Sequence, residues 1–265
     1  MDPIRIVVAG AAGRMGQLIV RNVVSDRECT LVGALERPRH ECIGSDAGMA
    51  GTGDTLGVTV TVDGSDVLRN VDALIDFTAP AVSVDFAQKA AEFRIVHVIG
   101  TTGFNPEQEG LIQTASMSAV IVKSGNMSLG ANLLAALVQQ AATVLQGFDV
   151  QIVEMHHRTK KDAPSGTALM LGRAAAATRG LNAPHLSDGC STAARNDAAI
   201  GFASLRGGTV VGDHKVIFAG AHERVILEHV AEDRAIFARG AIAAAKWGRN
   251  RTPGLYSMMD VLGVG

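Results

Sequence analysis

The sequence predicts an α/β protein, with an N-terminal Rossmann-like, doubly wound parallel sheet and a second α+β domain built on an open mixed sheet. Three observations support this fold class. A β-branched run, a glycine-rich turn and a helical pattern follow one another at the N-terminus, short buried-type strands then alternate with helical segments, and two later strands are separated by a hairpin-like break.

The N-terminal turn has the pattern of a dinucleotide-binding site. Residues 4–9 form an apolar strand that leads into glycines at positions 10, 13 and 16, and a helical pattern follows. Glycines allow a tight turn and close contact with a pyrophosphate, and a helix N-terminus favours negative charge. Because the spacing differs from G-x-G-x-x-G, the motif alone is moderately specific, and a plain β–α turn is the alternative.

The end of the next strand bears on the choice of cofactor. Residues 30–35 read as a strand that ends at Glu36 and Arg37, about 20 residues beyond the glycine turn, where an acid bonds the ribose hydroxyls. An acid favours NADH, whereas an arginine can accept the 2′-phosphate of NADPH. Glu36 and Arg37 together indicate that both NADH and NADPH can bind. The alternative is that they are ordinary solvated charged residues at a strand end.

The β/α alternation continues towards residue 127. Residues 71–77 and 95–99 read as buried strands, and a helix is expected from Pro80 to about Phe93. Strand ends at residues 77–80, 100–103 and 124–128 carry small polar residues, and parallel strands bring such loops to one edge of a sheet. We therefore expect a nicotinamide site at that edge.

The expected domain boundary lies near Met127. We expect residues 1–127, completed by 235–265, to form a dinucleotide-binding domain, and 128–234 to form a substrate-binding and oligomerisation domain. Within the second domain, residues 129–146 are predicted to be helical, and strands are predicted at 209–218 and 223–230. The helical stretch 234–247 is expected to return to the first domain.

The segment 154–168 combines two histidines, several cations and a helix start. Histidine can hold and release a proton near neutrality, and a nearby lysine can position an anion or help to deliver the proton, so His156, His157 and Lys160 suit general acid chemistry. Ser165 is a credible N-cap, and the helix start at Gly166 favours a carboxylate or phosphate. The alternatives are a solvated basic turn and, ranked low, a metal site, since neither HExxH nor a cysteine pair is present.

Composition narrows the class of protein. With 265 residues, 47% hydrophobic content and net charge −2, the chain is an ordinary globular protein, and the absence of a polybasic block argues against nucleic acid or a membrane surface as partner. Cys29, Cys42 and Cys190 follow no disulfide or zinc pattern. No signal peptide or transmembrane stretch is recognised, so we expect a cytoplasmic protein without a bound metal.

Three motifs together resemble the dihydrodipicolinate reductase (4-hydroxy-tetrahydrodipicolinate reductase) family over essentially the whole chain. They are the glycine turn, Gly100-Thr101-Thr102-Gly103, and the segment 154–167, which reads E-x-H-H-x-x-K-x-D-x-P-S-G-T. The resemblance implies an oxidoreductase of the diaminopimelate route of lysine biosynthesis. It would use NADH or NADPH to reduce 4-hydroxy-tetrahydrodipicolinate, via its dehydrated form, to tetrahydrodipicolinate, with hydride going to ring C4.

The resemblance also implies residue roles. His156 would be the proton donor, with help from Lys160, and the small dicarboxylate substrate would bind to His157, Lys160, Ser165, Gly166 and Thr167. Cofactor contacts are implied at Gly10, Ala11, Ala12, Gly13, Arg14, Met15, Glu36, Arg37, Gly100, Thr101, Thr102, Ser124, Gly125, Asn126 and Met127. A homotetramer joined through the second-domain sheets is implied as well. Ala79 stands where some members carry a basic residue, which makes NADPH preference less secure.

Two other functions remain open from the residues alone. Another two-domain dehydrogenase acting on an amino acid or imine would share the glycine turn but need not share residues 164–167. A nucleotide-sensing protein that has lost catalysis is the second alternative, and the intact His156 and Lys160 argue against it.

Overall fold

The chain divides into two compact units. The computed structural model describes residues 2–62, 64–179, 187–188 and 200–264. One unit consists of Met1–Ser128 with Ala235–Gly263, and Leu129–Arg234 makes up nearly all of the other.

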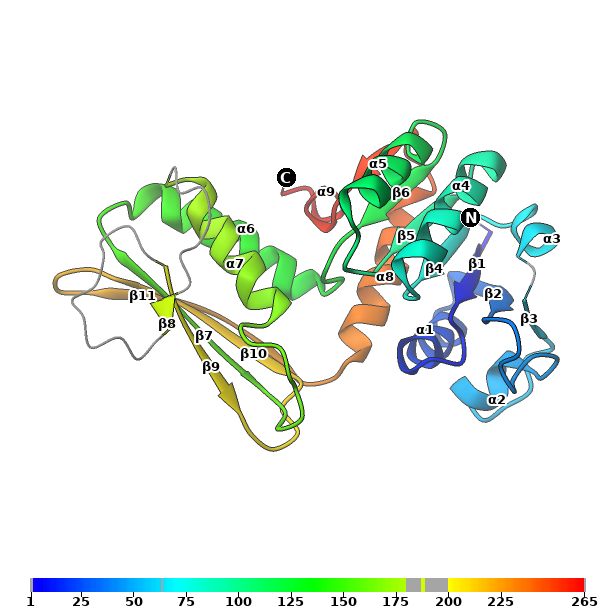
Figure 1. Ribbon diagram of the computed structural model, residues 1–265, viewed down its shortest axis with the longest axis horizontal. Coiled ribbons are helices and arrows are strands. Elements are labelled where there is room, and N and C mark those ends of the chain that lie inside the picture. Colours follow the sequence, from blue (N-terminus) through cyan, green and yellow to red (C-terminus); the bar gives the residue numbers. More distant parts are fainter. Residues whose placement is uncertain (1, 63, 180–186, 189–199, 265) are drawn as a thin grey trace. The chain divides into compact units, whose positions relative to one another are not determined.

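The first unit is built on a seven-stranded sheet in which every neighbouring pair of described strands is parallel (Figure 1). The spatial order is β12 (Gly254–Tyr256), β6 (Val120–Lys123), β5 (Val96–Ile99), β4 (Ala73–Asp76), β1 (Ile4–Ala9), β2 (Cys29–Leu35) and β3 (Val60–Thr61). The chain proceeds outward from β1 first on one side and then on the other. The carboxyl ends of β1 and β4 therefore adjoin at a topological switch point, where doubly wound folds bind ligands.

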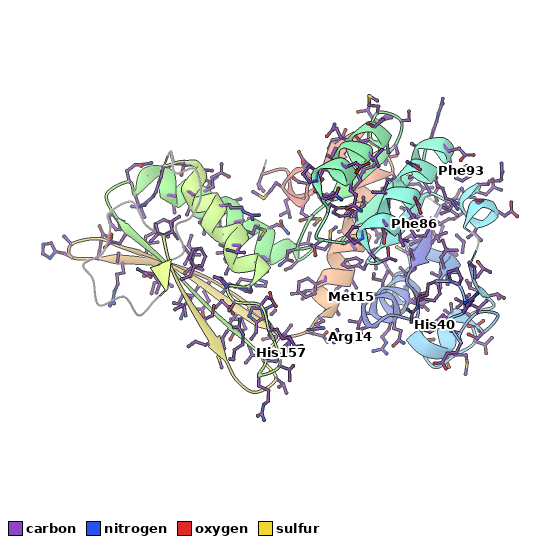
Figure 2. The ribbon with its side chains drawn as sticks, viewed as in Figure 1. Arg14, Met15, His40, Phe86, Phe93 and His157 are labelled. Carbon is purple, nitrogen blue, oxygen red and sulfur yellow. The ribbon has the colours of Figure 1, made fainter. Side chains whose placement is uncertain are left out.

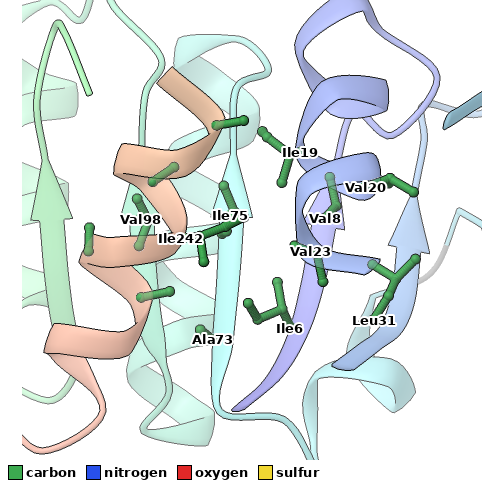
Figure 3. Close-up of a cluster of buried hydrophobic side chains, with 14 of the residues drawn as sticks. Ile6, Val8, Ile19, Val20, Val23, Leu31, Ala73, Ile75, Val98 and Ile242 are labelled. Atoms are coloured by element: carbon green, nitrogen blue, oxygen red, sulfur yellow. The ribbon is translucent and has the colours of Figure 1, made fainter. Parts of the chain in front are cut away.

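Helices cover both faces of this sheet. On one face, α1 (Arg14–Ser25) and α8 (Ala235–Gly248) bury apolar side chains against β1 and β4, as Figure 3 shows for Ile19, Val23 and Ile242 beside Ile6 and Ile75. On the other face lie α4 (Pro80–Phe93) and α5 (Pro106–Ala115). The described part of this unit also contains the shorter helices α2 (Ala47–Gly51), α3 (Ser65–Leu68) and α9 (Met258–Leu262).

The second unit is a mixed sheet with helices on one face. Its strand order is β11 (Arg224–Ala231), β10 (Gly212–Ala219), β7 (Asp149–His156), β9 (Ile200–Arg206) and β8 (Ser187–Asp188). The β10 strand is antiparallel to both neighbours, whereas β7 and β9 are parallel. The helices α6 (Leu129–Val144) and α7 (Gly166–Ala177) bury Ile152, Val216 and Phe218 beneath them.

The predicted fold class is confirmed. The last long helix, α8, contacts β4, β5 and β6 of the first sheet. Some elements differ from expectation. The strand expected at 209–218 begins at Gly212, and β12 was not expected, because three residues show no periodicity and β12 is a strand only through its pairing with β6. No helix in the described part of the chain is long and apolar enough to cross a membrane.

Candidate active site

The glycine turn joins β1 to α1 in the first unit. Gly10 has a positive φ of 68°, which favours glycine, and the Ala11 amide donates to the carbonyl of Leu35 over 3.1 Å. A Cβ on Gly16 would lie 2.0 Å from the Gly10 carbonyl oxygen, so α1 can approach the turn this closely only with glycine there. The turn leaves Arg14 exposed and Met15 half-buried in the first helical turn (Figure 2).

Glu36 lies directly beside this turn. Its carboxylate accepts hydrogen bonds from the Ala12 amide at 3.1 Å and from the Arg37 amide at 2.9 Å. A cavity of about 410 Å³ opens beside it. The cavity is lined by Gly10, Gly13, Leu35, Glu36, Arg37, Pro38, Val62, Phe77, Thr78, Ala79, Val82 and Phe86. Sequence reasoning found the charged pair but missed the apolar walls, because Val62 follows β3 whereas Val82 and Phe86 lie on α4, far from the glycine turn in the sequence.

The loops after β4 and β5 are tied together by a buried polar cluster. The carboxylate of Asp76 accepts from the Thr78 amide at 2.9 Å and from the Thr78 hydroxyl at 2.6 Å, and it lies 3.3 Å from Nε2 of His97. The Thr78 amide also donates to the Thr101 hydroxyl at 3.0 Å. Asp76 and His97 have no exposed surface, so this buried pair at the strands holds the loops after β4 and β5 in place.

The predicted cofactor residues after β5 and β6 differ in accessibility. Thr102 and Gly125 are exposed, and Gly100, Ser124 and Asn126 are half-buried. The side chains of Thr101 and Met127 are buried, at 7% and 1% exposure, which leaves their backbone as the part suited to ligand contact. A glycine cradle, an acid beside it and an adjacent apolar cavity fit a dinucleotide.

In the second unit, His156 is the last residue of β7 rather than a loop residue, and it is only 7% exposed. Alternation along the strand places Glu154 and His156 on the same face, and Nδ1 of His156 lies 2.5 Å from Oε2 of Glu154. Arg206 on β9 donates from Nη1 to Oε2 and from Nη2 to Oε1 of Glu154, each at 2.9 Å. This bidentate pair was not predicted from the sequence.

A second buried histidine, His214 on β10, completes the cluster. Its Nε2 lies 3.0 Å from Oγ of Ser165, and its ring contacts that of His156 edge to face, with 5.1 Å between centroids. Ser165 is the N-cap of α7, as predicted, and its hydroxyl accepts from the Ala168 amide at 3.2 Å. Sequence reasoning missed His214, because only the pairing of β10 with β7 brings it opposite Glu154.

The loop between His156 and Ser165 carries the remaining predicted residues. Nζ of Lys160 donates to both carboxylate oxygens of Asp162, at 2.9 and 2.8 Å. Nδ1 of His157 lies 2.8 Å from Oγ1 of Thr159, and Figure 2 shows His157 just beyond the end of β7. At the start of α7, Gly166 is exposed and Thr167 is half-buried.

Burial and charge set the proton affinities of this cluster. Burial raises the pKa of Glu154, but hydrogen bonds from Arg206, Ser204 and His156 outweigh it, so the pKa lies below its ordinary value and the carboxylate is ionised. Burial lowers the pKa of His156, the hydrogen bond and charge of Glu154 raise it, and the charges of Lys160 and Arg206 lower it, with a net decrease. Burial, with repulsion from His156, lowers the pKa of His214 to about 4, so this ring is neutral.

No group of three or more potential ligands for a metal occurs among the residues that the structure describes. Of the three cysteines, Cys29 and Cys42 are free thiols, and Cys190 lies outside the described residues.

Comparison with known proteins decides the family. Residues 4–127 match the family described as dihydrodipicolinate reductase, N-terminus, and residues 130–262 match its C-terminus counterpart. The chain belongs to the dihydrodipicolinate reductase family. It is 56% identical to the 4-hydroxy-tetrahydrodipicolinate reductase of Methylocella silvestris, with 100% of this chain and 99% of that protein covered. It is 55% identical to the Parvibaculum lavamentivorans enzyme of the same name, with 98% of each covered.

A solved structure supports the same assignment. The dipicolinate-bound dihydrodipicolinate reductase from Paenisporosarcina sp. TG-14 is 25% identical and superposes with a TM-score of 0.77, covering 97% of this chain and 98% of that one. The resemblance found in the sequence is thus confirmed. Like the dihydrodipicolinate reductases, this chain is an oxidoreductase of the NAD(P)H-dependent reduction step in diaminopimelate and lysine biosynthesis.

Proposed function

We propose that this chain reduces 4-hydroxy-tetrahydrodipicolinate, via its dehydrated cyclic imine, to tetrahydrodipicolinate, with His156 as proton donor. The observation that carries the residue assignment is the placement of His156 at the end of β7, beside the capped start of α7 and the loop that carries Lys160. A proton donor and an anion-binding helix start in one place suit a dicarboxylate that gains a proton.

The substrate carboxylates would be held by the loop and by the first turn of α7. Lys160, His157 and the hydroxyl of Ser165 supply the donors, and Gly166 leaves open space around its Cα, where a Cβ would meet no atom within 4 Å. Lys160 forms an ion pair with Asp162. A substrate carboxylate would therefore either compete with Asp162 for the Lys160 ammonium group or bind to it alongside Asp162.

The first unit would hold the cofactor. The turn from Gly10 to Met15 would contact the pyrophosphate, Glu36 the ribose, and the loops at 100–102 and 124–127 the nicotinamide. When bound, the reduced nicotinamide supplies the hydride for ring C4. As negative charge develops on the conjugated ring, His156 delivers a proton, while Lys160 and the α7 N-terminus stabilise the carboxylates.

Both NADH and NADPH are proposed as cofactors. Glu36 is half-buried and fixed between Ala12 and Arg37, where it suits a free ribose, whereas Arg37 is exposed beside the same cavity and suits a 2′-phosphate. Ala79, also in the cavity wall, adds no further cation.

A homotetramer in the cytoplasm is also part of the proposal. The face of the second sheet that α6 and α7 do not cover carries Leu205, Ile226 and Val230, each about half exposed at 51–53%. Apolar side chains on an open sheet face suit burial against another copy of the chain. Light scattering should give four times the chain mass for the wild type and a smaller particle for Ile226→Asp with Val230→Asp, and a monomeric wild type would refute the tetramer.

The enzymatic proposal is tested by NADH oxidation with freshly generated substrate. Wild-type protein should consume NADH only when the cyclic substrate is present, and pyridine-2,6-dicarboxylate should inhibit it. His156→Gln should lower kcat by about 10²–10⁴-fold, the usual contribution of a positioned acid, with NADH binding unchanged. His222→Gln, at an exposed histidine, is the matched control. Activity on another imine or amino acid, with none on this substrate, would overturn the proposal.

A further inference from the structure

Glu154 is a buried carboxylate that the proposed reaction does not use directly. It is 1% exposed and lies two residues before His156 on β7, so both side chains are on the face that α7 covers. Strand register places Arg206 of β9 opposite His156 and His214 of β10 opposite Glu154. Residues on three strands thus converge on one carboxylate.

Hydrogen-bond roles around Glu154 follow from its charge. An ionised carboxylate only accepts, so His156 must donate its Nδ1 proton to Oε2, and Arg206 donates to both oxygens. The Ser165 amide donates to Oε1 at 3.3 Å. The neutral His156 ring is therefore held in the Nδ1–H tautomer, with Nε2 as the atom that gains and loses a proton.

Arg206 connects the Glu154 carboxylate to the loop between His156 and Ser165. Besides its two bonds to Glu154, Nη2 donates to the Asp162 carbonyl at 2.7 Å, and Nη1 donates to the Leu205 carbonyl at 2.6 Å. The guanidinium thus fixes Glu154 and the loop that carries Lys160 in one geometry. Its planar fork suits this task, whereas a lysine would supply charge without the bidentate contact.

We propose that Glu154 and Arg206 are positioning residues for the proton donor: Arg206 orients the Glu154 carboxylate, which holds Nδ1 of His156 and leaves Nε2 to deliver the proton to the reduced ring. This inference rests on the proposed function. The ring takes a proton from solvent on Nε2, gives it to the substrate, and returns to neutral with Nδ1–H still on Glu154. Carboxylate–imidazole pairs orient proton-transfer histidines in other enzymes in the same way.

Removing the charge of Glu154 and removing the charge of Arg206 should shift the pKa of His156 in opposite directions. The groups that face it are Glu154 on its own strand, Arg206 on β9, His214 on β10 and Lys160 in the loop. Glu154 raises the pKa of His156 and Arg206 lowers it. An acid must be protonated to act, so its pKa sets the alkaline limb of the pH profile of kcat/KM.

The test is the pH profile of Glu154→Gln and Arg206→Gln. Both should lower kcat by about 10- to 100-fold, part of the 10²–10⁴-fold that a positioned acid contributes. Glu154→Gln should move the alkaline limb to lower pH, whereas Arg206→Gln should move it to higher pH. Arg206→Lys, which keeps the charge, should leave the limb in place and restore part of kcat. If both variants are folded and their alkaline limbs stay at the wild-type pH or shift in the same direction, the inference is overturned.

Two further measurements separate this inference from the proposed function. Glu223→Gln and Arg224→Gln, at exposed positions beside the β10–β11 turn, should match wild type, and thermal unfolding identifies variants that fail to fold. ¹⁵N NMR of the His156 ring should show the Nδ1–H tautomer in wild-type protein, whatever substrate is turned over. An Nε2–H tautomer would overturn the inference alone. A wild-type protein inactive on the cyclic substrate but with an Nδ1–H ring would overturn the proposed function, and with it proton delivery to that substrate, while the orientation of His156 by Glu154 would stand.

Discussion

Nε2 of His214 lies 3.0 Å from the hydroxyl of Ser165 and joins a buried histidine on β10 to the residue that caps α7. The Ser165 oxygen already accepts from the Ala168 amide. Because the pKa of His214 is lowered to about 4, the ring is neutral at working pH and acts on Ser165 as a fixed hydrogen-bond partner.

We expect His214→Leu to raise the KM for the dicarboxylate by about two- to tenfold, since one net hydrogen bond is worth about 0.5–1.5 kcal/mol and Ser165 would lose its orientation. His214→Gln, whose amide can still reach Ser165, should stay closer to wild type. Steady-state kinetics with varied substrate measure this, with His222→Leu as control. A KM for His214→Leu equal to that of wild type would show that the contact does not orient Ser165.

His214 should also make stability depend on pH. Its folded pKa of about 4 lies below its ordinary value of 6.5, so the unfolded chain takes up the proton first as the pH falls. This contribution to the free energy of unfolding is fully present above pH 6.5 and is lost as the pH falls towards 4. Urea unfolding at several pH values should show a shallower loss over this window for His214→Leu than for wild type, and equal slopes would contradict the burial argument.

Lys160→Ala should lower kcat/KM by about 10- to 100-fold, because a hydrogen bond to a charged group is worth about 1.5–3 kcal/mol. NADH binding, followed by fluorescence, should remain nearly intact. Lys161→Ala provides the control, since Lys161 is exposed and directly follows Lys160 in the chain. Unchanged kinetics for Lys160→Ala would remove this residue from the site.

Glu36→Ala should weaken the binding of NADH more than that of NADPH. The carboxylate that would bond the ribose hydroxyls disappears, while Arg37 remains for a 2′-phosphate. Calorimetric titration with each cofactor measures the two dissociation constants, and Glu41→Ala at an exposed position is the control. An equal loss for both cofactors would argue against the ribose assignment.

Asp76→Ala should lower the free energy of unfolding by about 3 kcal/mol, because each buried group left without a partner costs about 1–3 kcal/mol. The Thr78 hydroxyl and Nε2 of His97 both lose their bond to this carboxylate, whereas the Thr78 amide still donates to Thr101. Thermal and urea unfolding measure the change, and Asp85→Ala, on the exposed side of α4, is the control. A Tm within 1–2 °C of wild type would mean that the cluster adds little to stability, since about 1 kcal/mol shifts Tm by about 2–4 °C in a domain of this size.

Much of the fold could be predicted because it depends on local patterns. The strand–glycine–helix order at the N-terminus, the helix from Pro80 to Phe93 and the hairpin of β10 and β11 each follow from periodicity and turn residues. The edge strand β12 could not be predicted in this way, because a partner strand defines it. The residue roles of the cofactor site remain predictions, as does the functional division of the chain near Met127.

The sequence by itself determined the family and predicted the contiguous part of the site, because His156, Lys160 and Ser165 lie within one short segment whose residue types and spacing indicate their chemistry. Only the tertiary structure decided what surrounds His156, the proposed proton donor. Arg206 and His214 reach Glu154 and Ser165 from 52 and 49 residues away, through the register of β9 and β10 with β7. The physical reason is that hydrogen bonding between strands, together with burial under α7, selects which distant side chains share one face, and no local pattern encodes that choice.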